Sequence, residues 1–122
     1  DFDDIVKNSL LARSISIPFA LVLTEKLGGS ISLIPLFTVI TGLVGMLLGD
    51  LLLLWMKYKN HLASGAALGN AAHAMGIARA RQRHKLEGVI ASLSMIISGI
   101  IMVLFAPSLI AVTKYLLGFI SF

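Results

Sequence analysis

The stretch from residue 62 to residue 88, LASGAALGNAAHAMGIARARQRHKLEG, decides how the fold is interpreted. It begins with small residues, carries His73 in a run without Asp, Glu, Lys or Arg (residues 60–78), and ends in a basic run. The uncharged runs on either side, 27–49 and 88–113, are each long enough to cross ~30 Å of hydrocarbon at ~1.5 Å per helical residue. Polar groups on an interrupted segment between two such spans are expected to be functional.

Composition predicts a membrane protein. Of the 122 residues, 57% are hydrophobic and 13% are charged, whereas soluble domains average ~45–50% apolar and ~25% charged residues. The net charge is +4, but the basic residues lie at the ends of apolar segments, which favours a membrane surface over nucleic acid. The absence of cysteine excludes disulfide and thiol chemistry. We expect a single membrane domain over residues 1–122.

Two long transmembrane helices are predicted. The clearer one covers residues 30–55, and glycines on one side of it allow close approach of a neighbouring backbone. The second covers residues 89–106, where Pro107 breaks or kinks it before residues 108–122 continue. Asp50 is either an interfacial carboxylate or an ion-pathway residue. We favour the interface, because Trp55 and two lysines follow within two turns.

Residues 9–29 form an interrupted segment in this interpretation. Pro18 lacks an amide proton and disfavours helix at Ile17, while Ser14 and Ser16 compete for nearby backbone groups. We therefore expect a break over residues 14–18, a half-helix over residues 19–23 and a turn at the following Gly-Gly pair.

A weak internal repeat aligns residues 36–53 with residues 93–110, although apolar helices also match by chance. If the repeat is real, each unit is an interrupted, re-entrant segment followed by one full span, and successive units are inverted, as in many transporters. The fold class we expect is all-α: a polytopic integral membrane protein with two long transmembrane helices and two interrupted or re-entrant helical segments, arranged as an inverted repeat if the alignment holds.

His73 is the main candidate for chemistry. Burial of an ionisable group in a membrane is costly, so it predicts a partner or a transport pathway, and a pKa of ~6.5 suits proton-coupled movement of an acid. Hydrogen bonding between helices is the alternative. Gly65, Gly69 and Gly76 either allow close packing or unwind the chain and expose amide protons to a carboxylate. In the second case Asn70, Ser14 and Ser16 would add side-chain hydrogen bonds.

Other functions are disfavoured. The basic run over residues 77–85 lacks aromatic residues, which predicts a cytoplasmic membrane face and no nucleic acid. Glu87 is expected to pair with these cations or to cap the next helix. His61, His73 and His84 are too widely spaced for a helical metal site, so we expect no metal. No nucleophile with a base, phosphate loop or dinucleotide motif is present, so we expect neither an enzyme nor a cofactor.

Four stretches resemble the LrgB family: RSISIPFA (13–20), GAALGNAAHAMGIA (65–78), EGVIASLSMIISG (87–99) and the Ala106-Pro107 pair. These antiholin-like membrane proteins are paired with LrgA, as CidB is with CidA. The match covers nearly the whole chain in order. Family members are roughly twice as long, so the chain looks like a C-terminal half. The resemblance implies a multi-pass protein of the bacterial plasma (inner) membrane, tied to murein hydrolase control and cell lysis.

The resemblance also implies transport. A plastid relative carries glycolate and glycerate, and the bacterial pairs are associated with pyruvate. The positions that match the family pattern are Ser14, Ser16, Pro18, Gly69, His73, Gly76, Glu87 and Gly88. The chain differs where Asn70 and Ile77 replace Thr, Ala72 replaces Ser and Ile17 replaces a second Thr.

The leading hypothesis is a transporter, or half of one, for a small monocarboxylate such as pyruvate, glycolate or glycerate, coupled to protons through His73. The expected substrate-binding residues are Ser14, Ser16, Pro18, Gly69, Asn70, His73 and Gly76, supported by Arg13, Glu87 and Gly88. The alternative is an antiholin-like regulator that oligomerises with itself or with an LrgA/CidA-like partner. A third possibility, suggested by the missing hydroxyl groups, is a membrane scaffold without transport activity.

Overall fold

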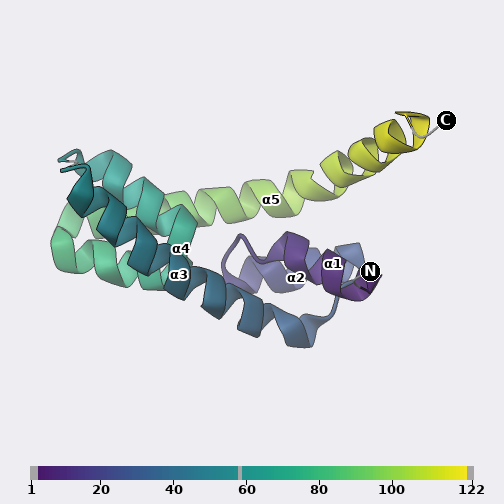
Figure 1. Cartoon of the computed structure of the whole chain (residues 1–122), viewed down its shortest axis with the longest axis horizontal. Helices are drawn as coiled ribbons and strands as arrows, with labels where there is room; N and C mark the ends of the chain where they lie inside the picture. Colours follow the sequence, from purple (N-terminus) through teal and green to yellow (C-terminus); the bar gives the residue numbers. More distant parts are fainter. Residues whose placement is uncertain (1–2, 58, 121–122) are drawn as a thin grey trace.

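The described part of the chain consists of helices. The computed structural model describes residues 3–57 and 59–120. The elements in chain order are α1 (Asp4–Ala12), α2 (Ile17–Leu27), η1 (Ile31–Leu33), α3 (Ile34–Trp55), α4 (His61–Arg83) and α5 (Lys85–Ile120) (Figure 1). Two stretches, Ile31–Trp55 and Lys85–Val112, are long and apolar enough to cross a membrane. The all-α prediction and the two predicted long helices are confirmed.

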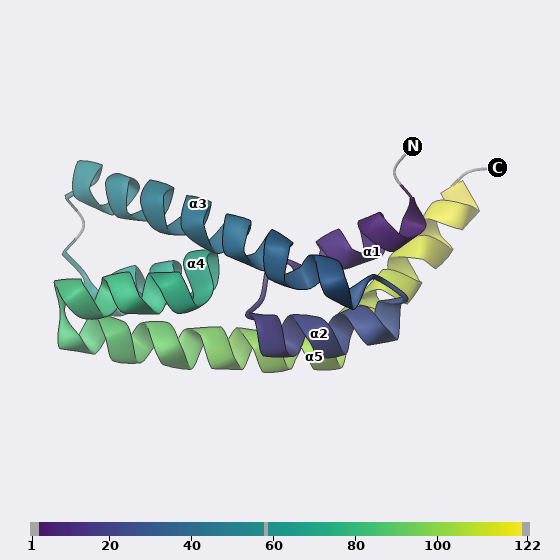
Figure 2. The same ribbon diagram turned by 90° about the horizontal axis from the view of Figure 1, so that it is seen from below.

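Helix α4 reverses its direction at His73. The φ and ψ angles of this residue are 51° and −129°, so the helix is interrupted there. A straight helix of 23 residues would hold its ends about 33 Å apart. The rings of His61 and His84 instead stack with their centroids 4.2 Å apart. The two arms, residues 61–72 and 74–83, therefore form a helical hairpin with His73 at its tip (Figures 1 and 2).

Helices α1 and α2 form a second hairpin around residues 13–16. Pro18 lies in the first turn of α2, where its missing N–H removes no intrahelical hydrogen bond. At the other end of α2, the Ser30 N–H donates to Ser9 Oγ at 2.7 Å and ties the two arms together. A break is present as predicted, but it covers residues 13–16 rather than 14–18, because Ile17 and Pro18 already form the first turn of α2. The helix that follows runs to Leu27 and is longer than the predicted half-helix over residues 19–23.

The two hairpins lie end to end, with their tips facing each other (Figure 2). Helix α4 packs on α3 and on the first part of α5, where Gly69 meets the main chain of Ala91. Helix α2 packs farther along α5, where the ring of Phe19 covers Gly99. The long helices α3 and α5 thus each contact both hairpins, and the two chain breaks come to one level between them.

Glycines allow the helical backbones to approach closely. A Cβ atom on any of four glycines would overlap main-chain atoms of a neighbouring segment: Gly45 with Ala71, Gly65 with Glu87, Gly69 with Ala91, and Gly76 with Leu68. Of the two roles left open for residues 65, 69 and 76, these contacts support close packing.

Ion pairs join the base of the α4 hairpin to both long helices. Asp50 of α3 pairs with Arg79 (2.6 Å) and Arg83 (3.0 Å). Arg83 also pairs with Glu87 of α5 (3.1 Å), whose other oxygen lies 2.7 Å from His61 Nδ1. The predicted pairing of Glu87 with neighbouring cations is therefore confirmed. This network lies at the end of the bundle where α3 ends and α5 begins.

Much of the apolar surface of α3 and α5 faces outward. Leu47, Leu51 and Leu104 expose 59%, 63% and 63% of their surface. Apolar patches of this kind mark contact with a membrane or with another protein. Helix α5 continues through Pro107 and changes direction in its last third (Figure 1), as a proline inside a helix predicts.

The glycine contacts yield a test of the packing. Gly69→Ala places a methyl group on the Ala91 main chain, so we expect the free energy of unfolding in detergent to fall by about 1–3 kcal/mol. Gly49→Ala is the matched control. Its Cβ would meet only the flexible end of Leu68 at 3.2 Å, and the gain of about 1 kcal/mol in helix propensity offsets this contact. Equal effects of the two substitutions would contradict the packing.

Candidate functional site

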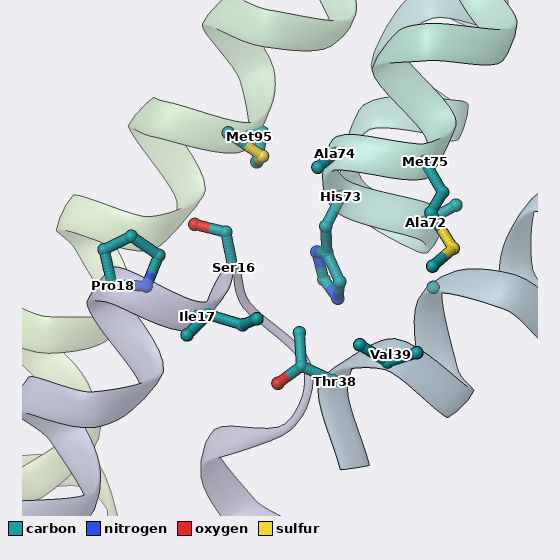
Figure 3. Close-up of a pocket in the computed structure, with 11 residues that line it drawn as sticks. Ser16, Ile17, Pro18, Thr38, Val39, Ala72, His73, Ala74, Met75 and Met95 are labelled. Atoms are coloured by element: carbon teal, nitrogen blue, oxygen red, sulfur yellow. The ribbon is translucent and has the colours of Figure 1, made fainter. Parts of the chain in front are cut away.

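A cavity of about 320 Å³ lies where the two hairpin tips meet α3 and α5 (Figure 3). Its walls come from the start of α2, from α3, from the tip of α4 and from α5. The lining residues are Ser16, Ile17, Pro18, Thr38, Val39, Gly42, Ala72, His73, Ala74, Met75 and Met95. The structure thus brings together three of the predicted site residues, Ser16, Pro18 and His73.

Two helices begin at this cavity. Helix α2 begins at Ile17, and the Ser16 side chain forms no capping hydrogen bond. The second arm of α4 begins directly after His73. The first turn of a helix carries amide protons without intrahelical partners and a partial positive charge, so it stabilises an anion. Two such helix starts at one cavity favour an anionic ligand.

Two residues that line the cavity each carry a buried polar atom without a hydrogen-bond partner in the described structure. The atoms are Thr38 Oγ1 and His73 Nε2, in residues that are 5% and 4% exposed. The imidazole lies close to the main chain of Arg13 at the tip of the first hairpin. In Figure 3 the ring projects from α4 towards Thr38. An unsatisfied buried polar atom costs about 1–3 kcal/mol, which a hydrogen-bonding ligand would recover.

The backbone of His73 is strained. A positive φ is rare for a residue with a side chain, and such a conformation costs on the order of 1–3 kcal/mol. Strained residues persist where the surrounding contacts hold them, and they cluster at binding sites. His73 thus combines two features of a binding-site residue, a strained backbone and an unpartnered side-chain nitrogen.

Comparison with known proteins identifies the family. The model of the LrgB-like family matches residues 1–112. The chain belongs to the LrgB-like family. This confirms the resemblance found in the sequence.

Several curated relatives support the assignment. The holin-like protein CidB of Staphylococcus aureus (strain Mu50) is 35% identical over 102 residues, which cover 84% of this chain and 44% of CidB. The Bacillus subtilis (strain 168) protein YwbG is 32% identical over 104 residues, which cover 85% of this chain and 46% of YwbG. The chain therefore spans less than half the length of these relatives. No solved structure matches the chain.

Other predicted site residues of this LrgB-like chain lie outside the cavity lining. Ser14 is exposed in the bend between α1 and α2. Asn70 is exposed on the first arm of α4 and donates to the Ala66 carbonyl at 3.0 Å. Gly69 and Gly76 lie at helix contacts. A substrate-binding role for these four residues stays a prediction.

The three predicted supporting residues lie in two places. Arg13 is at the first hairpin tip, and its Nη1 donates to Thr41 Oγ1 at 3.3 Å. Glu87 and Gly88 are at the base of the α4 hairpin, where Gly88 packs against Arg81. Of the three, only Arg13 therefore lies at the hairpin tip that borders the cavity, and it does not line the cavity.

Sequence reasoning missed Thr38. The signal was a hydroxyl group inside a long apolar span, one turn before the Thr41-Gly42 pair. Such a residue is equally compatible with local bonding to its own helix, so the sequence alone did not distinguish it.

The strain at His73 predicts that glycine is more stable than alanine at this position, the reverse of their order in a regular helix. In a regular helix, alanine is more stable than glycine by about 1 kcal/mol. At a φ of 51° glycine is unstrained, so we expect the free energy of unfolding of His73→Gly to exceed that of His73→Ala by about 1 kcal/mol. His73→Gly should therefore unfold at the higher temperature. Thermal unfolding of both variants in detergent measures this, and a more stable alanine variant would contradict the reversal.

Proposed function

We propose that this LrgB-like chain is a membrane transporter, or half of one, for a small monocarboxylate such as pyruvate, glycolate or glycerate. The observation that carries the proposal is that two residues lining one cavity at two helix starts, Thr38 and His73, each have an unpartnered polar atom, Oγ1 and Nε2. A carboxylate suits the partial positive charge of the helix starts, and its oxygens accept hydrogen bonds.

The arrangement of the hairpins supports a transport function. We take each hairpin to be re-entrant, so that α1, α2 and α3 form one unit and α4 and α5 form a second, inverted unit. The hairpins approach each other from opposite ends of the two long helices (Figure 2). Interrupted helices that meet between inverted repeats are where many secondary transporters bind their substrates. In this topology the exposed apolar faces of α3 and α5 contact the lipid of the bacterial plasma membrane.

The polar atoms have separate roles in this proposal. The Thr38 hydroxyl donates to the substrate. His73 Nε2 accepts a hydrogen bond when the imidazole is neutral and donates one when it is protonated, so the ring can carry a proton with the acid. The apolar walls exclude water and strengthen these interactions. Ile17 and Ala72, which replace hydroxyl residues of the family pattern, also line the cavity. We therefore expect weaker binding of hydroxyl-rich acids such as glycerate.

A second candidate is a holin-like or antiholin-like regulator of murein hydrolase export and cell lysis. The name of the staphylococcal relative, holin-like protein CidB, fits this function somewhat better than it fits a carrier. Under this proposal the chain assembles with copies of itself or with an LrgA/CidA-like membrane protein through the exposed apolar faces of α3 and α5. Its activity would be passage of solutes through the assembly rather than selective uptake.

Uptake into proteoliposomes tests the carrier. We expect saturable uptake of labelled pyruvate, glycolate or glycerate, and a roughly 10- to 100-fold lower affinity in Thr38→Val and His73→Gln, because a hydrogen bond to a charged group contributes about 1.5–3 kcal/mol. Thr24→Val is the matched control, since Thr24 Oγ1 is also buried and unpartnered but does not line the cavity.

The same vesicles separate the two candidates. Unselective leakage of an entrapped dye, without saturable uptake of any of the three acids, would contradict the carrier and support the holin-like function. Equal losses in Thr38→Val and Thr24→Val would show that the cavity is not the binding site.

A further inference from the structure

Arg13 connects the two hairpin tips with α3. Its main chain lies close to the His73 imidazole, and its guanidinium donates to Thr41 Oγ1 at 3.3 Å. Thr41 precedes the cavity-lining Gly42 and follows Thr38 by one helical turn. The guanidinium therefore contacts α3 one residue before the cavity-lining Gly42, and it does not line the cavity itself.

The charge of Arg13 lies near the middle of a candidate membrane span. Its partner Thr41 is about 15 Å from one end and 21 Å from the other end of Ile31–Trp55 at 1.5 Å per residue. An arginine at this depth is costly, and such residues mark substrate pathways or pair with an opposite charge. Its position far from both ends of the span argues against an anchoring role at the membrane surface.

No described carboxylate pairs with this guanidinium. The acidic side chains that form ion pairs do so elsewhere: Asp4 with Lys7, Asp50 with Arg79 and Arg83, and Glu87 with Arg83 and His61. Asp3 accepts a hydrogen bond from the Ile5 N–H at the start of α1. Within residues 3–57 and 59–120, the side chain of Arg13 thus has only a neutral hydroxyl partner, at the long end of the hydrogen-bond range.

We propose that Arg13 supplies the positive charge that pairs with the carboxylate of the substrate at the edge of the cavity. The side chain is exposed and held by a single hydrogen bond, so it is free to leave Thr41 for a carboxylate. Its planar guanidinium matches both oxygens of a carboxylate. This inference rests on the proposed transport function and adds the residue that selects an anion over an uncharged analogue.

A structural role for Arg13 makes a different prediction. If the side chain only ties the first hairpin to α3, Thr41→Val removes the same hydrogen bond and has the same effect as Arg13→Gln. If Arg13 binds the carboxylate, Thr41→Val releases the guanidinium and leaves its charge available. Arg13→Gln then lowers the affinity for the substrate, whereas Thr41→Val preserves it.

The experiment measures competition against labelled pyruvate uptake in proteoliposomes, with unlabelled pyruvate and its uncharged analogue pyruvamide as competitors. We expect wild type and Thr41→Val to prefer pyruvate over pyruvamide. Arg13→Gln should lose most of this preference, with at least a tenfold higher KM for pyruvate, and Arg13→Lys should recover part of it. The pyruvate-to-pyruvamide ratio reports charge recognition, which a loss of folded protein does not change.

The outcomes separate this inference from the proposed function. Saturable uptake by wild type, with an unchanged preference for pyruvate in Arg13→Gln, overturns the role of Arg13 and leaves the carrier intact. Equal losses in Arg13→Gln and Thr41→Val also overturn it in favour of a structural tie. If Arg13→Gln does not fold, a partial or full preference for pyruvate in Arg13→Lys supports the charge, and complete loss overturns it. Absence of uptake of any acid by wild type overturns both proposals.

Discussion

The reversal of α4 at His73 is the constraint on which the rest of the structure depends. It brings His61 beside His84, so that both ends of α4 reach the same end of the bundle. Only in this arrangement can the second arm of α4 form an ion pair with Asp50 while both arms, through His61 and Arg83, pair with Glu87. The same reversal places a new helix start, and the imidazole itself, at the level of the first hairpin tip. The cavity exists because these two chain breaks meet.

The cost of the reversal is offset by contacts along the arms and at their base. Glycines let the hairpin backbone lie directly against α3 and α5, which increases the van der Waals contact of helices that have no hydrophobic driving force in lipid. The ion pairs at the base leave the charges of Asp50 and Glu87 compensated. Stability thus comes from the base and the arms, whereas the tip keeps the strained His73 backbone and the unpartnered Thr38 and His73 atoms.

The sequence predicted the parts of this fold that depend on local signals. Charge-free runs predicted the two long helices, and the interrupted, small-residue composition around His73 marked the second break. Pro18 predicted the start of α2 to within two residues, at residue 19 rather than Ile17. The direction of the chain after His73 was not predictable, because nothing local requires a positive φ at a histidine. Thr38 and the contact between Arg13 and Thr41 were missed because they depend on how separate helices pack. For the same reason, the sequence could not distinguish glycines that allow close helix packing from glycines that unwind the helix.

The most direct test of the account is the proximity of the two ends of α4 in the membrane. The chain has no cysteine, so His61→Cys with His84→Cys introduces a single pair. Our account predicts efficient cross-linking by oxidation or by a short bifunctional thiol reagent, because the native rings stack at 4.2 Å. His61→Cys with Ala72→Cys is the control, since these positions lie about 16 Å apart along one arm. Failure of the first pair to cross-link, as expected for a straight helix with its ends about 33 Å apart, would contradict the reversal and the site built on it.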